Sequence, residues 1–479
     1  MLRYKYLLIS AVILLSLFFV NSEIFAAGTL TPDTNAVQTE HSVQHILPAT
    51  IMILPFIVLL LMIATGPLFY RHFWEKHYPK VAIILGLITV GYYLFVLHDT
   101  LTLVNTLAEY LSFIALLSSL FVASGGILIK VDKKSSPMIN VIFLLIGAVI
   151  SNIIGTTGAS MLLIRPYIKM NQNRIKPYHI IFFIFIVSNI GGALTPIGDP
   201  PLFLGFLRGV PFFWVIENIW YIWLPTIAML LAVFYLFDIR NPGKETTQIN
   251  FSGKIEFKGL KNLGFLAIII IAVFIDPAVI PGVPNLYEMF GLPFGIREII
   301  MFAVVFISFK SADEEILKAN EFDFEPIKEV AFLFIGIFAT MIPALQLIAY
   351  EARVLSDQLS AGVFFWATGL LSGILDNAPT YLNFLSAAMG KYALDINVKA
   401  QVQEFVVHDD IYLQAVSVAA VFFGAITYIG NGPNFMVKSI CERAGIQMPS
   451  FFTYIIKYSV LILIPIFIVI WLLFFYAKG

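Results

Sequence analysis

Two acidic residues interrupt apolar stretches of this chain, each beside residues that break a helix. Asp199 stands in SNIGGALTPIGDPP, residues 188–201, and Asp376 stands in LDNAPT, residues 375–380. Proline removes a backbone donor and glycine relaxes the backbone, so both stretches predict interrupted helices with free carbonyl groups and helix ends. In a bilayer, a central carboxylate costs about 2.5–3.5 kcal/mol and usually marks an ion or proton pathway.

The composition indicates that these residues lie in a membrane. Of the 479 residues, 59% are hydrophobic and 12% are charged, whereas a soluble chain carries about 25% charged residues. We therefore predict an all-α polytopic membrane protein in a lipid bilayer. With 29 basic and 30 acidic residues, the chain lacks the basic stripe of nucleic-acid-binding proteins. Its single cysteine excludes an intrachain disulfide and a multi-cysteine metal site.

The N-terminal segment predicts a processed leader. Residues 1–27 combine a basic start, an apolar stretch and a small-residue end, as in a signal peptide, and an uncleaved first transmembrane helix is the alternative. Residues 28–45 are polar and predict an extracytoplasmic tail. Because basic loops stay in the cytoplasm, we expect a multi-pass protein of the inner (plasma) membrane. Stretches long enough to cross it are 46–66, 81–98, 103–129, 178–207, 212–238, 262–282, 297–309, 329–350, 411–437 and 451–476.

Two further segments predict re-entrant hairpins. Residues 138–165 are apolar, break near GTTGAS and have basic residues on both flanks, so both ends favour the cytoplasm. Residues 361–391 have the same form, with DNAPT as the break. The running count of crossings places the ends of this second hairpin on the opposite side.

The two hairpins belong to an internal repeat. GALTPIGDPP at 192–201 aligns without gaps with GAITYIGNGP at 424–433, matching at six of ten positions. Repeat 1 covers residues 46–238, a cytoplasmic linker covers 239–261, and repeat 2 covers 262–479. Each contains about five crossing helices plus one re-entrant hairpin, and the count of crossings makes the repeats inverted. Inverted repeats with broken helices at the midplane are typical of secondary transporters.

The segments EYLSFIALLSSLFVASGGI, SNIIGTTGASMLLIRP, TPIGDPPLFLGFLRGVPFFW and LDNAPTYLNF resemble a known group of transporters. They are similar to the sodium:proton antiporter and arsenite permease (NhaD/ArsB-like) branch of the ion transporter superfamily, with its citrate-transporter-like relatives. The resemblance implies an elevator-like movement of the inverted repeats, often in a homodimer. It implies site residues at the hairpin tips and helix breaks. Together with the residue-based reading, the candidates are Asn152, Thr156, Thr157, Thr195, Asp199, Asp376, Asn377, Thr380, Thr427 and Asn431.

Sodium:proton antiport is the function that these residues favour most, with Asp376 as the leading ion-binding residue. A hard cation such as Na⁺ prefers oxygen ligands, and a carboxylate can exchange Na⁺ or Li⁺ for H⁺. Na⁺ and H⁺ are then transported ions, and no cofactor or other metal is expected. A carrier for citrate or another carboxylate is the alternative, with helix N-termini in place of buried basic residues. A carrier for an arsenite-like oxyacid stays open.

Structural roles and other protein classes compete with this reading. Asp199 and Asp376 can act as helix caps, and Glu109 and Glu329, which match between the repeats, are expected to be interfacial caps, with a role in proton coupling as the alternative. An enzyme is disfavoured because His98 and His408, with their acidic neighbours, fall in predicted loops. The sequence has no GxxxxGK phosphate loop for an ATP-driven pump. A passive channel is disfavoured because paired breaks suit alternating access.

Overall fold

The computed structural model describes residues 47–131, 134–241, 253–277, 279–280, 282–284, 286, 289 and 294–476. The expected signal peptide and tail lie outside these residues. Within them, eight helices are long and apolar enough to cross a membrane, and a bent pair over residues 399–426 is a ninth candidate. The two described strands, β1 (Leu128–Val131) and β2 (Ile255–Lys258), form one short antiparallel pair. The chain is therefore an all-α polytopic membrane protein.

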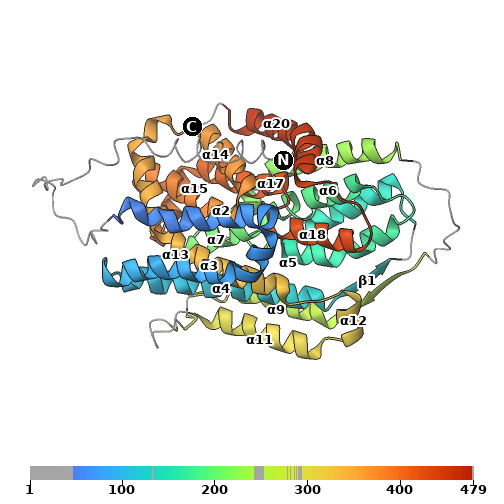
Figure 1. Cartoon of the computed structure of the whole chain (residues 1–479), viewed down its shortest axis with the longest axis horizontal. Coiled ribbons are helices and arrows are strands. Elements are labelled where there is room, and N and C mark those ends of the chain that lie inside the picture. The colour runs from blue at the N-terminus through green and yellow to red at the C-terminus, as the bar shows by residue number, and fades with distance from the viewer. Residues whose placement is uncertain are drawn as a thin grey trace, which may run out of the picture. The chain divides into compact units, whose positions relative to one another are not determined.

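One set of helices packs together and is called the flanking bundle below. In Figure 1, α3, α4, α9 and α11 lie along the lower side of the view. The long helix α13 packs against α2, α3 and α4, and α11 packs against α4 and α9. The members are η2 (Thr50–Ile53), α2 (Leu54–Phe69), α3 (Arg71–Phe95), α4 (Thr100–Gly125), α9 (Lys261–Val273), α11 (Ile296–Ser311) and α13 (Glu325–Val354).

A second set, called the hairpin bundle below, contains both segments that were predicted to be hairpins and both predicted broken helices. Its members are α5 (Pro137–Met170), α6 (Pro177–Ile186), η3 (Ile190–Leu194), α7 (Pro200–Arg208), α8 (Trp214–Asp238), α14 (Ala361–Ile374), α15 (Asn377–Lys391), α16 (Lys399–His408), α17 (Asp410–Phe423), η5 (Gly424–Ile426), α18 (Gly432–Arg443), α19 (Phe451–Tyr454), η6 (Ile455–Leu463) and α20 (Ile464–Phe474). The two bundles meet where α13 packs along α15 and where α4 packs against α5 and α7. Short α12 (Glu314–Ala319) and η4 (Ser356–Gln358) lie between longer helices in the chain.

The segment labelled α5 folds back on itself at Gly155. A straight helix of its 34 residues would be about 51 Å long. Gly155 instead has φ +77° and ψ 155°, outside the helical region. The backbone N–H of Ser135 donates to the carbonyl of Met170 at 3.2 Å, so the two ends of the segment lie side by side. The turn at Gly155 therefore divides α5 into two arms of a hairpin.

The second hairpin consists of α14 and α15, which pack against each other. Leu375 is extended and Asp376 is the N-cap of α15, so the helix stops and restarts within two residues. At the opposite end, Lys391 Nζ donates to the carbonyls of Ser356 and Leu359, just before α14, at 2.8 and 3.0 Å. The arms of this segment also lie alongside each other.

Two of the expected crossings end at least four residues early, and a third helix is short. The expected crossing 262–282 corresponds to α9, which stops at Val273 and is about 20 Å long, while α11 covers the whole expected crossing 297–309 and is about 24 Å long. Both are shorter than the ~30 Å hydrocarbon core. The expected crossing 103–129 ends at Gly125, because the chain then turns into β1.

Gly155 is the position where we expect a single methyl group to matter most. Gly155→Ala places a Cβ in a left-handed conformation, 3.3 Å from the carbonyl oxygen of Ile197, and strain of this kind costs about 1–3 kcal/mol. The thermal unfolding midpoint of the purified protein in detergent should therefore fall. Gly91→Ala is the control, since its added Cβ meets no atom within 4 Å and alanine favours a helix. Equal midpoints for the two variants would contradict this view of the turn.

Candidate functional site

The two helix breaks have the same local geometry. After η3, the hydroxyl oxygen of Thr195 accepts a hydrogen bond from the N–H of Gly198 at 3.1 Å. After η5, the hydroxyl oxygen of Thr427 accepts one from the N–H of Gly430 at 3.0 Å. In both, a threonine three residues before a glycine satisfies a backbone donor that the interrupted helix leaves free. The aligned sequence motifs therefore form matching turns.

At the first break, Gly198 packs directly against the backbone of η3. A Cβ added to Gly198 would lie 2.1 Å from the carbonyl oxygen of Gly192, so no larger residue fits there. The carbonyl of Gly198 in turn accepts a hydrogen bond from the N–H of Thr156, the first residue after the turn in α5, at 2.8 Å. This contact connects the tip of the first hairpin directly to the first break.

Asp199 lies where both hairpins and both breaks meet. Thr156 Oγ1 donates to Asp199 Oδ1 at 2.7 Å, and Asn431 Nδ2 donates to the same oxygen at 3.0 Å. Asn377 Nδ2 donates to Asp199 Oδ2 at 2.7 Å. Each of the four residues exposes 2% or less of its surface. We call these four residues the Asp199 hub.

Each hub residue stands at the N-terminal end of a helix. Asp199 is the N-cap of α7, Asn431 is the N-cap of α18 and Asn377 is the first residue of α15. Thr156 begins the second arm of α5. A helix N-terminus carries a partial positive charge that favours a nearby anion, while the helix ends that precede these turns carry a partial negative charge. Four helix N-termini therefore surround the carboxylate of Asp199.

The sequence match identifies the family to which this architecture belongs. The model of the family CitMHS_2, described as "Putative citrate transport", matches residues 44–475. The chain belongs to the CitMHS_2 family. The description of the family names transport, and eight helices among the described residues are long and apolar enough to cross a membrane. This CitMHS_2 protein is therefore a multi-pass membrane transporter. The match agrees with the citrate-transporter-like part of the resemblance and is not specific to the NhaD/ArsB-like branch. No curated protein matches the chain.

The other predicted site residues are close to the hub residues in sequence, and most of their side chains form hydrogen bonds with backbone groups. Asn152 Oδ1 accepts from the N–H of Leu194 at 2.8 Å, while Thr195 Oγ1 donates to the carbonyl of Asn152 at 2.6 Å. Thr380 Oγ1 donates to the carbonyl of Asp376 at 2.8 Å. These side chains, like that of Thr427, hold the breaks and the second tip in shape.

Asp376, the residue that the sequence favoured most, has a different position from Asp199. Its Oδ1 accepts a hydrogen bond from the N–H of Ala378 at 3.0 Å, the usual contact of an N-cap. Its side chain is half-buried, and no hydrogen bond joins it to the hub residues. The structure therefore gives Asp376 the capping geometry that was the alternative reading and makes Asp199 the carboxylate shared by the four elements.

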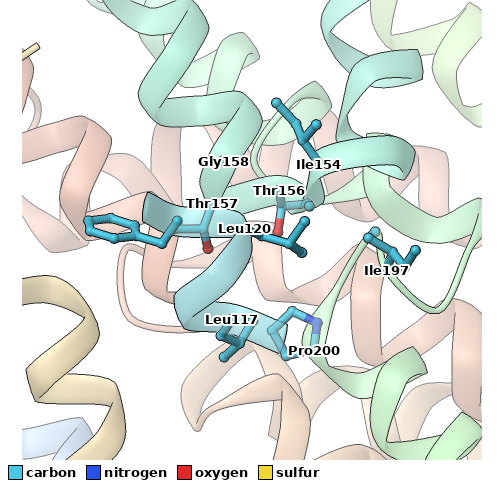
Figure 2. A pocket seen from close by; sticks show the side chains of 11 residues that line it. Leu117, Leu120, Ile154, Thr156, Thr157, Gly158, Ile197 and Pro200 are labelled. Carbon is cyan, nitrogen blue, oxygen red and sulfur yellow. The ribbon is translucent and has the colours of Figure 1, made fainter. Parts of the chain in front are cut away.

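Thr157 borders a small cavity beside the hub. Figure 2 shows Thr156 and Thr157 at the first tip, with Leu117 and Leu120 of α4 and Pro200 of α7 around the same space. The cavity measures about 20 Å³, which is room for about one water molecule. It lies between the hairpin bundle and α4.

Three polar residues of the site were not among the predicted ones. Asn431 Nδ2 is also 3.2 Å from the carbonyl oxygen of Ser188 and from Asn189 Oδ1. Asn189 Nδ2 donates to Asn434 Oδ1 at 2.6 Å, and Asn434 Nδ2 donates to the carbonyl of Thr427 at 2.9 Å. The signal available in the sequence was the position of these residues beside the two breaks, in SNIGG and GNGPN.

The two acids are expected to respond differently to removal of their charge. Asp199→Asn removes an ionic acceptor of three buried hydrogen bonds, each worth about 1.5–3 kcal/mol when one partner is charged. Asp376→Asn keeps an equally good N-cap. Thermal unfolding in detergent should show a clear drop for Asp199→Asn and a change within about 0.5 kcal/mol for Asp376→Asn. A larger loss in Asp376→Asn would show that Asp199 is not the central carboxylate.

Proposed function

We propose that this CitMHS_2 protein is a secondary transporter of citrate or a closely related carboxylate, coupled to a cation. The observation that supports this most is the convergence of four helix N-termini at the Asp199 hub. Helix N-termini favour nearby anionic groups. The description of the family agrees with an anionic carboxylate substrate.

In this proposal, Asp199 is the residue that binds the coupling cation. An anionic substrate beside an ionised carboxylate raises the negative charge of the site, and a cation bound at Asp199 offsets it. Na⁺ suits carboxylate and hydroxyl oxygens, such as those of Asp199 and Thr156. H⁺ needs only the carboxylate. Inward gradients of either ion supply free energy, and one charge crossing 100 mV is worth about 2.3 kcal/mol.

Sodium:proton antiport is the second candidate function. The observation that favours it is the buried carboxylate of Asp199, which is held among hydroxyl and amide groups. Such a group exchanges a metal cation for a proton without an organic substrate. The two candidates therefore differ in whether a carboxylate must be present for ion movement.

Alternating access completes the proposal. The hairpin bundle carries the hub, and the flanking bundle packs against it along α13 and α4. We propose that the hairpin bundle slides against the flanking bundle to expose the hub to each side in turn. A place in the inner (plasma) membrane and assembly as a homodimer belong to the same proposal.

Transport in proteoliposomes tests the substrate. Purified protein should accumulate labelled citrate when an inward Na⁺ or H⁺ gradient is imposed, and Asp199→Asn should lose this uptake. Dye-reported proton movement on adding Na⁺ or Li⁺ without citrate, lost in the same variant, would instead support antiport. Absence of both responses, with a folded protein, would contradict both candidates.

A disulfide across the two bundles tests the sliding movement. A Cβ added to Gly158 on α5 lies 3.5 Å from Ser124 Cβ on α4, within the range of disulfides. In a Cys441→Ser background, Ser124→Cys with Gly158→Cys should crosslink under mild oxidation and stop transport until a reductant is added. Gly86→Cys with Ala339→Cys is the control, because this pair lies within the flanking bundle, with its Cβ atoms slightly closer together at 3.3 Å. Transport that continues through the first crosslink would rule out sliding at this contact.

A further inference from the structure

Helix α7 connects the Asp199 hub to a second charged contact. Asp199 caps its N-terminus and Arg208 is the last of its nine residues, so the two ends are about 13 Å apart. Arg208 Nη2 lies 2.8 Å from Glu109 Oε2, on α4 of the flanking bundle. One short rigid helix of the hairpin bundle is thus held by a charged side chain at each end.

The position of Glu109 differs from that expected of an interfacial cap. It lies inside α4, and its side chain exposes 19% of its surface, while that of Arg208 exposes 8%. Arg208 Nη1 also donates to Asn397 Oδ1, just before α16. The ion pair is therefore largely buried.

The end of α7 is shaped to leave Arg208 in this position. Gly209 follows with φ +117°, a left-handed C-cap that glycine adopts without strain. A Cβ on Gly209 would approach Cβ and Cγ of Lys399 to 3.4 Å, so the Lys399 side chain packs over the turn. Lys399 is the second cation that acts on Glu109, so one acid here faces two basic residues.

This pair is distinct among the contacts that join the two bundles. In the described part of the chain, the other ion pairs of α5 and α18 with a segment next to the flanking bundle involve Glu321, which precedes α13 and is 3.3 Å from Arg165 and 3.9 Å from Arg443. The Glu321 side chain is 60% exposed, and exposed pairs contribute little. Loss of one partner of a buried pair is far more disruptive, because the other charge stays buried without compensation.

We propose that Glu109 and Arg208 are a pair of positioning residues that hold α7 against α4 and thereby set the place of Asp199, and that this ion pair opens when the hairpin bundle moves. The proposal rests on the alternating-access function above. It assigns a role in transport to residues that do not contact the hub. The substrate site and the bundle interface are then coupled through the nine residues of α7.

The first test is a double-mutant cycle in the transport assay. Glu109→Gln and Arg208→Gln should each raise the apparent KM for citrate roughly tenfold, a coupling typical of linked sites. The double variant should be no worse than the poorer single variant, because it leaves no lone buried charge. Glu329→Gln is the matched control, since Glu329 occupies the corresponding place in the other repeat but is exposed on α13. Additive effects, or an equal effect of the control, would overturn the proposal.

The second test measures the bundle contact without transport. In the Ser124→Cys, Gly158→Cys reporter, Glu109→Gln should slow crosslinking several-fold, because fewer molecules keep α7 and α5 against α4. Glu329→Gln should leave the rate unchanged. An unchanged rate in Glu109→Gln, with normal crosslinking of the parent, would overturn the positioning role alone. Failure of the parent to crosslink, or a crosslink that leaves transport intact, would instead count against the sliding movement.

Discussion

The organisation of the hairpin bundle depends on the hydrogen bonds to the buried carboxylate of Asp199. A buried negative charge is costly unless donors surround it, and here the donors come from three other chain segments, through Thr156, Asn377 and Asn431. Four helices must therefore begin at one place, with their N-termini directed toward it. The hairpin turns and the two breaks meet this requirement.

Interrupted helices create a second requirement, because each break leaves backbone groups without helical partners. In an apolar environment these groups must be satisfied from within the protein. Ser151 on the first hairpin donates to the carbonyl of Val187, and Ser372 on the second donates to the carbonyl of Ala420, at 2.8 and 2.6 Å. Both carbonyls precede a break. In both repeats, a serine hydroxyl thus satisfies a backbone carbonyl beside the break.

The two repeats differ where chemistry is expected. The aligned breaks place Asp199 opposite Asn431, so one supplies a charge and the other supplies a donor to it. Asn189 and Asn434 extend the contact, and they align with the apolar residues Val421 and Leu202 of the other repeat. A symmetric pair of acids would repel at this distance. The asymmetry gives one carboxylate a neutral, hydrogen-bonding surrounding.

The sequence by itself determined the membrane setting, the helices and the places where they break, because hydropathy and the chemistry of glycine and proline act locally. It also placed Thr156, Asp199, Asn377 and Asn431 among the candidates. Only the tertiary structure decided that these four meet and that Glu109 pairs with Arg208. Those outcomes depend on which segments pack together across 43 to 232 residues of chain, and local pattern carries no information on such distant contacts.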